Sequence, residues 1–217
     1  MGHIIAEQPD MLKDSVYNAI RTRIITQDLP PGSRINEKQF MDEYGIGKTP
    51  LREVFFRLQY DGLIRRFPRS GTIVAPLDFG ELRDAAEIRL ALEGLVGDLA
   101  AKLITVEQLE AMRRHTDLLE RTSREGVHAE YVITEAQLHG MLYAATRNEK
   151  LRQTITEQQS LFSRIWFSIE RTPGDLAPQV ADWRNICAAL AERDARRVVQ
   201  INKQHFKTFY SHLKAIF

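Results

Sequence analysis

The sequence predicts a mainly α-helical protein in two parts, and two observations carry this prediction. Within residues 37–75, a helical pattern, a glycine-containing turn, a second helical pattern and a basic hairpin follow one another, which is the order of a winged helix-turn-helix. After Phe79, the chain is helical in character to its end. We therefore expect an N-terminal winged helix-turn-helix domain, residues 1–76, and a C-terminal all-α bundle of six helices, residues 77–217.

Turn-forming residues divide the first domain into short elements. Asp28-Leu29-Pro30-Pro31-Gly32 ends a first amphipathic helix, and Asn36 is a suitable cap for the next one. A turn at Gly45-Ile46-Gly47 separates that helix from a third, which stops before Gly62. The pattern predicts helices over residues 12–27, 37–43 and 49–60, and short strands over residues 63–67 and 72–75.

The second domain follows a linker at Pro76-Leu77-Asp78. Thr105 and Asp194 are suitable helix caps, and Thr172-Pro173-Gly174 is the clearest break between helices. About 140 residues are enough to bury a core of their own. Six helices are expected here, over residues 80–102, 105–124, 127–146, 149–171, 178–192 and 194–216.

The composition is that of a water-soluble protein. No apolar run approaches the roughly 18 residues that a membrane span requires, and residues 1–10 lack the basic start and apolar core of a signal peptide. The single cysteine, Cys187, excludes an internal disulfide and a cysteine-rich zinc site. We expect a cytoplasmic protein without a membrane partner.

Basic residues gather in one short segment. From Lys48 to Arg69 there are six basic and two acidic residues, whereas residues 77–217 hold 19 Lys and Arg against 20 Asp and Glu. A local basic patch on a nearly neutral chain indicates that one end meets an anion, although a solvated helix face gives the same pattern. The neighbouring helix-turn-helix pattern favours double-stranded DNA as the anion.

The start of the third predicted helix carries the residues best suited to read DNA. Arg52 is placed to donate two parallel hydrogen bonds to the guanine acceptors of the major groove. Lys48 and Thr49 precede it at the helix N-terminus, where backbone N–H groups also favour phosphate. These three residues are our candidates for DNA contacts.

A second group of candidate residues lies in the helical domain. Glu135 and His139 are four residues apart, so they share a helix face, and apolar neighbours indicate that this face turns inward. His205 lies far downstream on another apolar face. A shared metal ion would satisfy all three side chains if they meet. The alternative is a surface Glu/His pair and an unrelated core histidine.

On these residues the chain resembles a GntR-family transcriptional regulator of the FadR type, which carries an FCD effector-binding domain. The resemblance rests first on Leu29 to Ile35, Gly45 to Arg52, and Leu58 to Arg65 with Ser70-Gly71-Thr72. In the second domain it rests on Glu87 to Glu93 and Leu99-Ala100-Ala101. The number of predicted helices resembles the VanR-like branch of this class.

The resemblance implies further DNA contacts and two departures from the family pattern. Lys38 and the wing around Arg69 and Gly71 are expected to contact DNA as well. Lysine at Lys38 and Lys48 replaces the arginine that is frequent in the family, and lysine cannot form the planar fork. Gly47 replaces a serine or threonine, so a helix cap is lost.

The resemblance also bears on the candidate metal site. Metal-binding members use an Asp, a His four residues later and two further His residues, the last about 22 residues after the third ligand. Here Glu135 takes the place of the Asp, and the third position falls on Trp183, which cannot bind a metal. Three ligands and water could still hold Zn²⁺ or Ni²⁺. Arg89 is the candidate for binding an effector carboxylate, and an intrahelical pair with Glu93 is the alternative.

Taken together, these residues indicate a homodimeric transcriptional repressor that binds operator DNA and is not an enzyme. The expected effector is a small organic acid, with a bound metal as a further possibility. Two alternatives remain open at this point. One is a metal-dependent enzyme in a helical bundle, and the other is a regulator whose helical domain only dimerises and binds no ligand.

Overall fold

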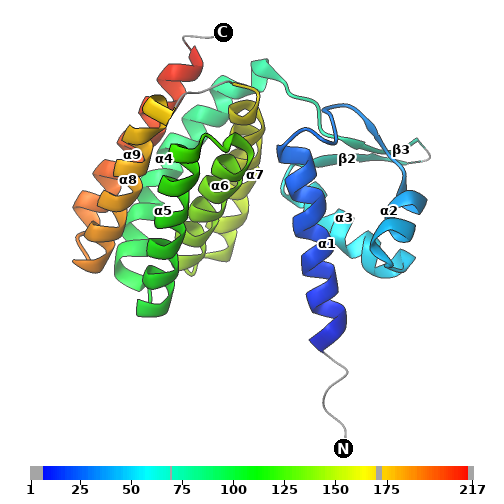
Figure 1. Ribbon diagram of the computed structural model, residues 1–217, viewed down its shortest axis with the longest axis horizontal. Coiled ribbons are helices and arrows are strands. Elements are labelled where there is room, and N and C mark those ends of the chain that lie inside the picture. The colour runs from blue at the N-terminus through cyan, green and yellow to red at the C-terminus, as the bar shows by residue number, and fades with distance from the viewer. Residues whose placement is uncertain (1–6, 69, 170–172, 215–217) are drawn as a thin grey trace, which may run out of the picture. The chain divides into compact units, whose positions relative to one another are not determined.

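The computed structural model describes residues 7–68, 70–169 and 173–214 (Figure 1). The chain forms two compact units, Met1–Leu77 and Asp78–Phe217. Helices make up most of both units, which confirms the predicted mainly α-helical class. None of the described helices has the length and apolar character that a membrane span requires.

The first unit is a winged helix-turn-helix, as predicted. Its three strands form one antiparallel sheet in the order β1-β3-β2, in which β2 and β3 are the wing. The short β1 was not expected from the sequence, because two residues are too few to show an alternating pattern and gain their order from pairing with β3. The elements are α1 (Glu7–Ile25), β1 (Arg34–Ile35), α2 (Glu37–Tyr44), α3 (Lys48–Tyr60), β2 (Ile64–Phe67) and β3 (Gly71–Val74).

The turn between α2 and α3 has the chemistry that a sharp reversal requires. Asn36 caps α2, since its side chain accepts hydrogen bonds from the backbone of Lys38 and Gln39. Gly45 ends α2 in the left-handed conformation, at φ 60°, where a side chain would be strained. Apolar residues of α1 and α3 then close the core beneath the turn, among them Ile20, Ile24, Val54, Phe55 and Leu58.

The second unit is a bundle of six described helices, again as predicted (Figure 1). Helix α4 is central to it: α4 packs most extensively against α9 and also contacts α6, α7 and α8. Gly97 permits this close approach, because a Cβ there would lie 3.0 Å from the backbone of Val199. The helices are α4 (Phe79–Leu103), α5 (Val106–Glu125), α6 (His128–Ala145), α7 (Glu149–Phe167), α8 (Pro173–Ala191) and α9 (Ala195–Lys214).

Most predicted helix boundaries agree with the structure within two residues, and three do not. Helix α1 begins at Glu7 instead of residue 12, and α7 ends at Phe167 instead of residue 171. Helix α8 begins at Pro173 instead of residue 178, because Pro173 suits a first helical position and the bundle tolerates Pro178 inside the helix. The predicted break at Thr172 lies partly outside the described residues, and the predicted end of the last helix at residue 216 lies outside them and is not compared.

Both predicted caps in this unit are present. The Thr105 hydroxyl accepts from the backbone N–H of Gln108 at 3.2 Å, and the Gln108 side chain accepts from the backbone N–H of Thr105 at 3.0 Å. This reciprocal pair is a capping box at the start of α5. Asp194 accepts from the backbone N–H of Arg197 at 3.0 Å and so caps α9.

We predict that Thr105→Ala lowers the free energy of unfolding of the helical unit by about 1 kcal/mol, because one backbone donor of α5 loses its cap. Both tryptophans, Trp166 and Trp183, lie in this unit, so their fluorescence during urea unfolding reports on it. Thr154→Ala is the control, since the exposed Thr154 hydroxyl bonds only to a carbonyl of its own helix. Equal losses in the two variants would contradict the assignment.

Candidate functional site

The backbone N–H groups at the start of α3 are not capped by a side chain. Gly47 is the N-cap residue, and no side chain caps the helix, so the sequence-based expectation of a lost cap is correct. Lys48 and Thr49 lie in the first turn of α3, Arg52 follows directly after that turn, and all three are exposed. An uncapped helix N-terminus surrounded by cations is a favourable place for a phosphate group.

The other predicted DNA contacts occupy two further places in the first unit. Lys38 is exposed in the first turn of α2. Gly71 begins β3 with φ 96°, a backbone conformation that glycine adopts without strain. Arg69 lies outside the described residues.

Some basic residues of the patch have partners within the unit, and this separates them from Arg52. Arg57 forms an ion pair with Asp14, and its guanidinium lies over the Tyr17 ring, 4.2 Å from the centroid. The guanidinium of Arg66 lies 5.1 Å from the centroid of the Phe56 ring. Arg52 has no hydrogen bond or ion pair with any described residue, so its guanidinium is free to meet a ligand.

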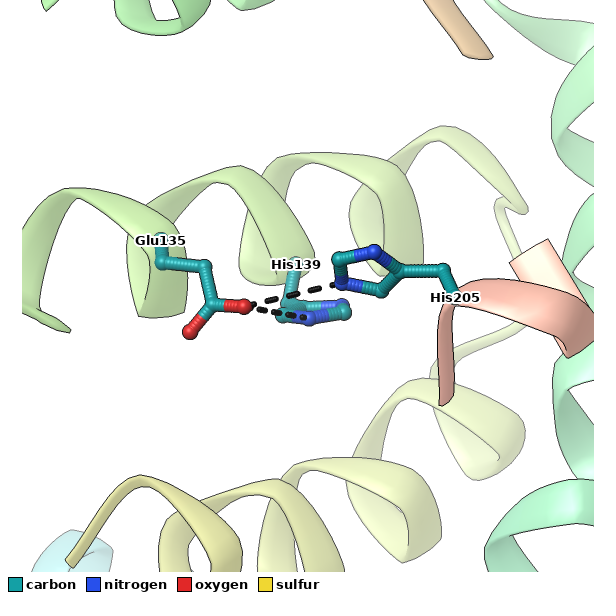
Figure 2. A group of neighbouring side chains, drawn as sticks. All are labelled: Glu135, His139 and His205. Atoms are coloured by element: carbon teal, nitrogen blue, oxygen red, sulfur yellow. Dashed lines mark ion pairs between the residues drawn. The ribbon is translucent and has the colours of Figure 1, made fainter. Parts of the chain in front are cut away.

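In the second unit, Glu135, His139 and His205 meet (Figure 2). All three are buried, and one possible ligand atom from each lies within 4.8 Å of the others. The Glu135 Oε1 atom is 3.9 Å from His139 Nε2 and 3.5 Å from His205 Nε2. Residues from α6 and α9 therefore converge, as the hypothesis of a shared metal ion requires.

The two imidazoles of this group differ in charge. Burial and the positive charges of Arg89 and His205 hold the pKa of His139 well below its ordinary value, so His139 is neutral. Burial also disfavours charge on His205, but the hydrogen bond to Asp182 and the carboxylate of Glu135 raise its pKa to about 9. Asp182 Oδ2 is 3.2 Å from His205 Nδ1 and thereby orients the ring so that Nε2 faces Glu135.

Trp183 lies directly beside this group. Its ring centroid is 4.8 Å from that of His139 and 5.6 Å from that of His205, with both contacts edge to face. Its side chain is fully buried, and the indole Nε1 has no hydrogen-bond partner among the described residues. The indole occupies space next to both histidines, so the group offers three donors and no fourth from this position.

Arg89 lies in the same region, and the predicted alternative of a pair with Glu93 is correct. Arg89 Nε donates to Glu93 Oε1 at 2.9 Å, and both side chains are buried. Arg89 Nη2 is 3.4 Å from His139 Nε2 and 3.4 Å from the Tyr143 hydroxyl. Burial opposes the charge, but Tyr143 and Glu93 outweigh it and hold the pKa of Arg89 above its ordinary value.

The pairing with Glu93 does not remove Arg89 from the site. A small cavity is lined by Arg89 and by the group of Glu135, His139 and His205. Its remaining walls come from α7 and α9, and they are Gln159, Phe162, Ser163, Trp166, Phe206 and Phe209. A single small cavity thus joins a cation, three possible metal ligands and an aromatic wall.

Sequence reasoning missed several polar residues around this cavity. Tyr143 follows His139 by four residues, so the spacing on α6 could have identified it. Asn202 donates to Glu93 Oε2 at 2.6 Å across the α4–α9 contact, and Asp182 reaches His205 from α8. No local spacing in the sequence links Asn202 or Asp182 to its partner, because each contact joins two different helices.

Comparisons with known proteins match both units. Residues 12–74 match the model for bacterial regulatory proteins of the gntR family, and residues 84–208 match the FCD domain model. The chain is 24% identical over 204 residues to the HTH-type transcriptional regulator YdhC of Bacillus subtilis, covering 92% of this chain and 90% of YdhC.

A second relative and a solved structure agree. The HTH-type transcriptional repressor RspR of Escherichia coli is 23% identical over 208 residues, which cover 94% of this chain and 90% of RspR. The structure of E. coli McbR/YncC has the same fold, with a TM-score of 0.73 at 20% identity over 93% of this chain and 98% of that one. The chain therefore belongs to the GntR family of bacterial regulatory proteins, in the class with an FCD domain, and is a sequence-specific DNA-binding transcriptional regulator.

Proposed function

We propose that this regulator is a homodimeric repressor whose affinity for operator DNA is controlled by a small organic acid bound in the helical unit. The observation that carries the proposal is the cavity in which the buried Arg89 guanidinium lies beside Glu135, His139 and His205. The relative RspR is named a transcriptional repressor, which supports repression over activation for this protein. Nothing in this arrangement requires a catalytic role, and we propose none.

We propose that α3 reads DNA through its N-terminal end. Arg52 supplies base discrimination, because a free guanidinium can bind the two guanine acceptors with a planar fork. Lys38 and Lys48 supply affinity through phosphate contacts that weaken as salt rises. Thr49, Gly71 and Arg69 complete the proposed contacts on the helix and the wing.

We propose that the second unit dimerises through α4. One winged unit reads too few base pairs to be selective, so paired half-sites are expected. Ile88, Leu92, Leu95 and Leu99 follow one another at helical spacing, and Ile88 and Leu95 are 48% and 44% exposed. A second copy of α4 would cover this apolar stripe symmetrically.

Helix α4 would also connect the effector to the dimer. Arg89 and Glu93 lie within the same turns of α4 as the exposed Ile88 and Leu95. An acid that binds Arg89 in one dimer geometry better than in another shifts the protein toward that geometry. Release from DNA follows when the favoured geometry no longer matches the spacing of the half-sites.

We further propose that Glu135, His139 and His205 hold a divalent metal, Zn²⁺ or Ni²⁺, through Oε1 and the two Nε2 atoms. The donor set fits such an ion, and the contact of Asp182 with His205 is the outer hydrogen bond that commonly orients a ligating histidine. When bound, the metal supplies a Lewis acid for the effector carboxylate. The six described helices α4 to α9 support placement in the VanR-like branch.

Trp183 favours a second candidate function, in which the helical unit dimerises without binding any ligand. Its bulk lies where a further ligand or part of an effector could lie. The two candidates differ in measurable metal and acid binding. The absence of both from the purified protein, even after Zn²⁺ is added, would favour the second.

We predict that Arg52→Ala weakens operator binding by about 1–3 kcal/mol and relaxes discrimination at one base position. Competition binding with operator variants and random DNA measures both effects. Arg57→Ala on the same helix is the control, because Arg57 is engaged with Asp14 and Tyr17. If Arg52→Ala weakened operator and random DNA equally, Arg52 would be a phosphate contact and not a base reader.

We predict that Leu95→Glu converts the dimer to a monomer, since a symmetric contact would place two carboxylates in an apolar interface. Analytical ultracentrifugation at micromolar concentration measures the association. Val106→Glu is the control, because Val106 is 64% exposed at the start of α5, away from the stripe. A Leu95→Glu protein that remained dimeric would place the interface elsewhere.

We predict about one Zn²⁺ or Ni²⁺ per chain in protein purified without a histidine tag or chelator, since Zn²⁺ can be held by three side chains and water. His139→Ala should lose this metal, and Trp183→His should bind Zn²⁺ more tightly because it adds a fourth donor. Elemental mass spectrometry and chelator competition measure content and affinity. The triple variant Glu135→Gln, His139→Ala, His205→Ala is the control, and stoichiometric metal retained by it would mean that the metal lies at another site.

A further inference from the structure

Phe56 is an exposed aromatic residue on the same side of α3 as Arg52. It follows Arg52 by four residues and Thr49 by seven, so the three side chains lie along one face of the helix. Phe56 is 56% exposed, whereas Phe55, its neighbour in sequence, is buried in the core of the winged unit. The core of the unit therefore does not account for an aromatic ring at this position.

The groups around Phe56 suit an anionic partner. The guanidinium of Arg66, on β2, lies 5.1 Å from the centroid of the Phe56 ring and so holds the ring from the side of the wing. Lys48 and Arg52 are exposed on the same helix. An apolar protein surface that covered Phe56 would also remove these charges from water without compensation, whereas DNA brings phosphates to meet them.

The DNA major groove offers one kind of apolar group to such a ring. Base edges in this groove present hydrogen-bond donors and acceptors, and thymine adds a methyl group on C5. The side chain of Phe56 has no atom that donates or accepts a conventional hydrogen bond. It can therefore distinguish one base from another through apolar contact with this methyl group.

We infer that Phe56 reads a thymine of the operator through contact between its ring and the C5 methyl group. Four residues of α-helix rise about 6 Å, and neighbouring base pairs are about 3.4 Å apart. The thymine therefore lies about two base pairs from the guanine that Arg52 binds. This inference rests on the proposed function, because it requires α3 to enter the major groove at Arg52.

The experiment removes the methyl group and nothing else. The unchanged full-length protein first selects its operator from a random duplex library. Each thymine of one selected half-site is then replaced by deoxyuridine, one at a time, and fluorescence anisotropy gives each affinity. We expect deoxyuridine at one position to weaken binding about three- to fivefold, as burial of one methyl group provides. In Phe56→Ala, the thymine and deoxyuridine duplexes bind equally.

Two further variants test whether the effect belongs to the Phe56 ring. Tyr60→Ala removes another exposed aromatic residue, one turn further from the start of α3, and keeps the full ratio between the thymine and deoxyuridine duplexes. Phe56→Leu keeps part of the ratio, because leucine still presents an apolar surface to the methyl group. Because Phe56 is exposed, both of its variants keep the melting temperature of the unchanged protein, so a lost ratio does not reflect lost folding.

The remaining outcomes separate this inference from the proposed function. A half-site in which no thymine responds to deoxyuridine, a response that persists in Phe56→Ala, or a response that Tyr60→Ala abolishes would each overturn the role of Phe56 and leave base reading by Arg52 standing. Arg52→Ala weakens the thymine and deoxyuridine duplexes by the same factor. If Arg52→Ala bound both duplexes as tightly as the unchanged protein, the proposed role of Arg52 would be wrong, and a ratio that depends on Phe56 would still establish the thymine contact.

Discussion

The buried ion pair between Arg89 and Glu93 is the interaction on which the helical unit depends. Two charges one turn apart on α4 are removed from water, which costs hydration free energy. Their mutual attraction offsets this cost only because further groups hydrogen-bond to the carboxylate. Tyr143 on α6 donates to Glu93 Oε1, and Asn202 on α9 donates to Oε2. Loss of one member would leave a buried charge without compensation, at a cost of about 3–5 kcal/mol. The pair therefore fixes α4 against two neighbouring helices.

This constraint explains why the candidate site lies where it does. The cavity draws its wall from α4, α6, α7 and α9, so its shape depends on how these four helices are held together. Close packing at Gly97 fixes the distance between α4 and α9. The hydrogen bonds from Asn202 to Glu93 fix how the two helices are aligned along their length. An acid that competes with Glu93 for Arg89 would act on the same contacts that position α4.

How much the sequence could predict follows from the range of the interactions involved. Helical spacing revealed the six helices and the shared face of Glu135 and His139, since these are patterns within one element. The contact between His205 and Glu135 joins α9 to α6. Without the family resemblance, the sequence did not distinguish such a contact from a surface Glu/His pair and an unrelated core histidine. The buried position of Gln159 could not be predicted, because an isolated glutamine in an amphipathic helix resembles a surface residue. Tertiary packing determines both its burial and the absence of a hydrogen bond from any described residue to its side-chain oxygen.

Gly47 has a consequence for the energetics of the winged unit. A serine or threonine at this position would cap α3 from within the protein, whereas glycine leaves the first-turn N–H groups to water. A DNA phosphate bound there, as proposed, would supply the missing cap from outside. Part of the folding stability of the recognition helix would then come from the operator itself, so that DNA would act as a component of the folded domain as well as its target.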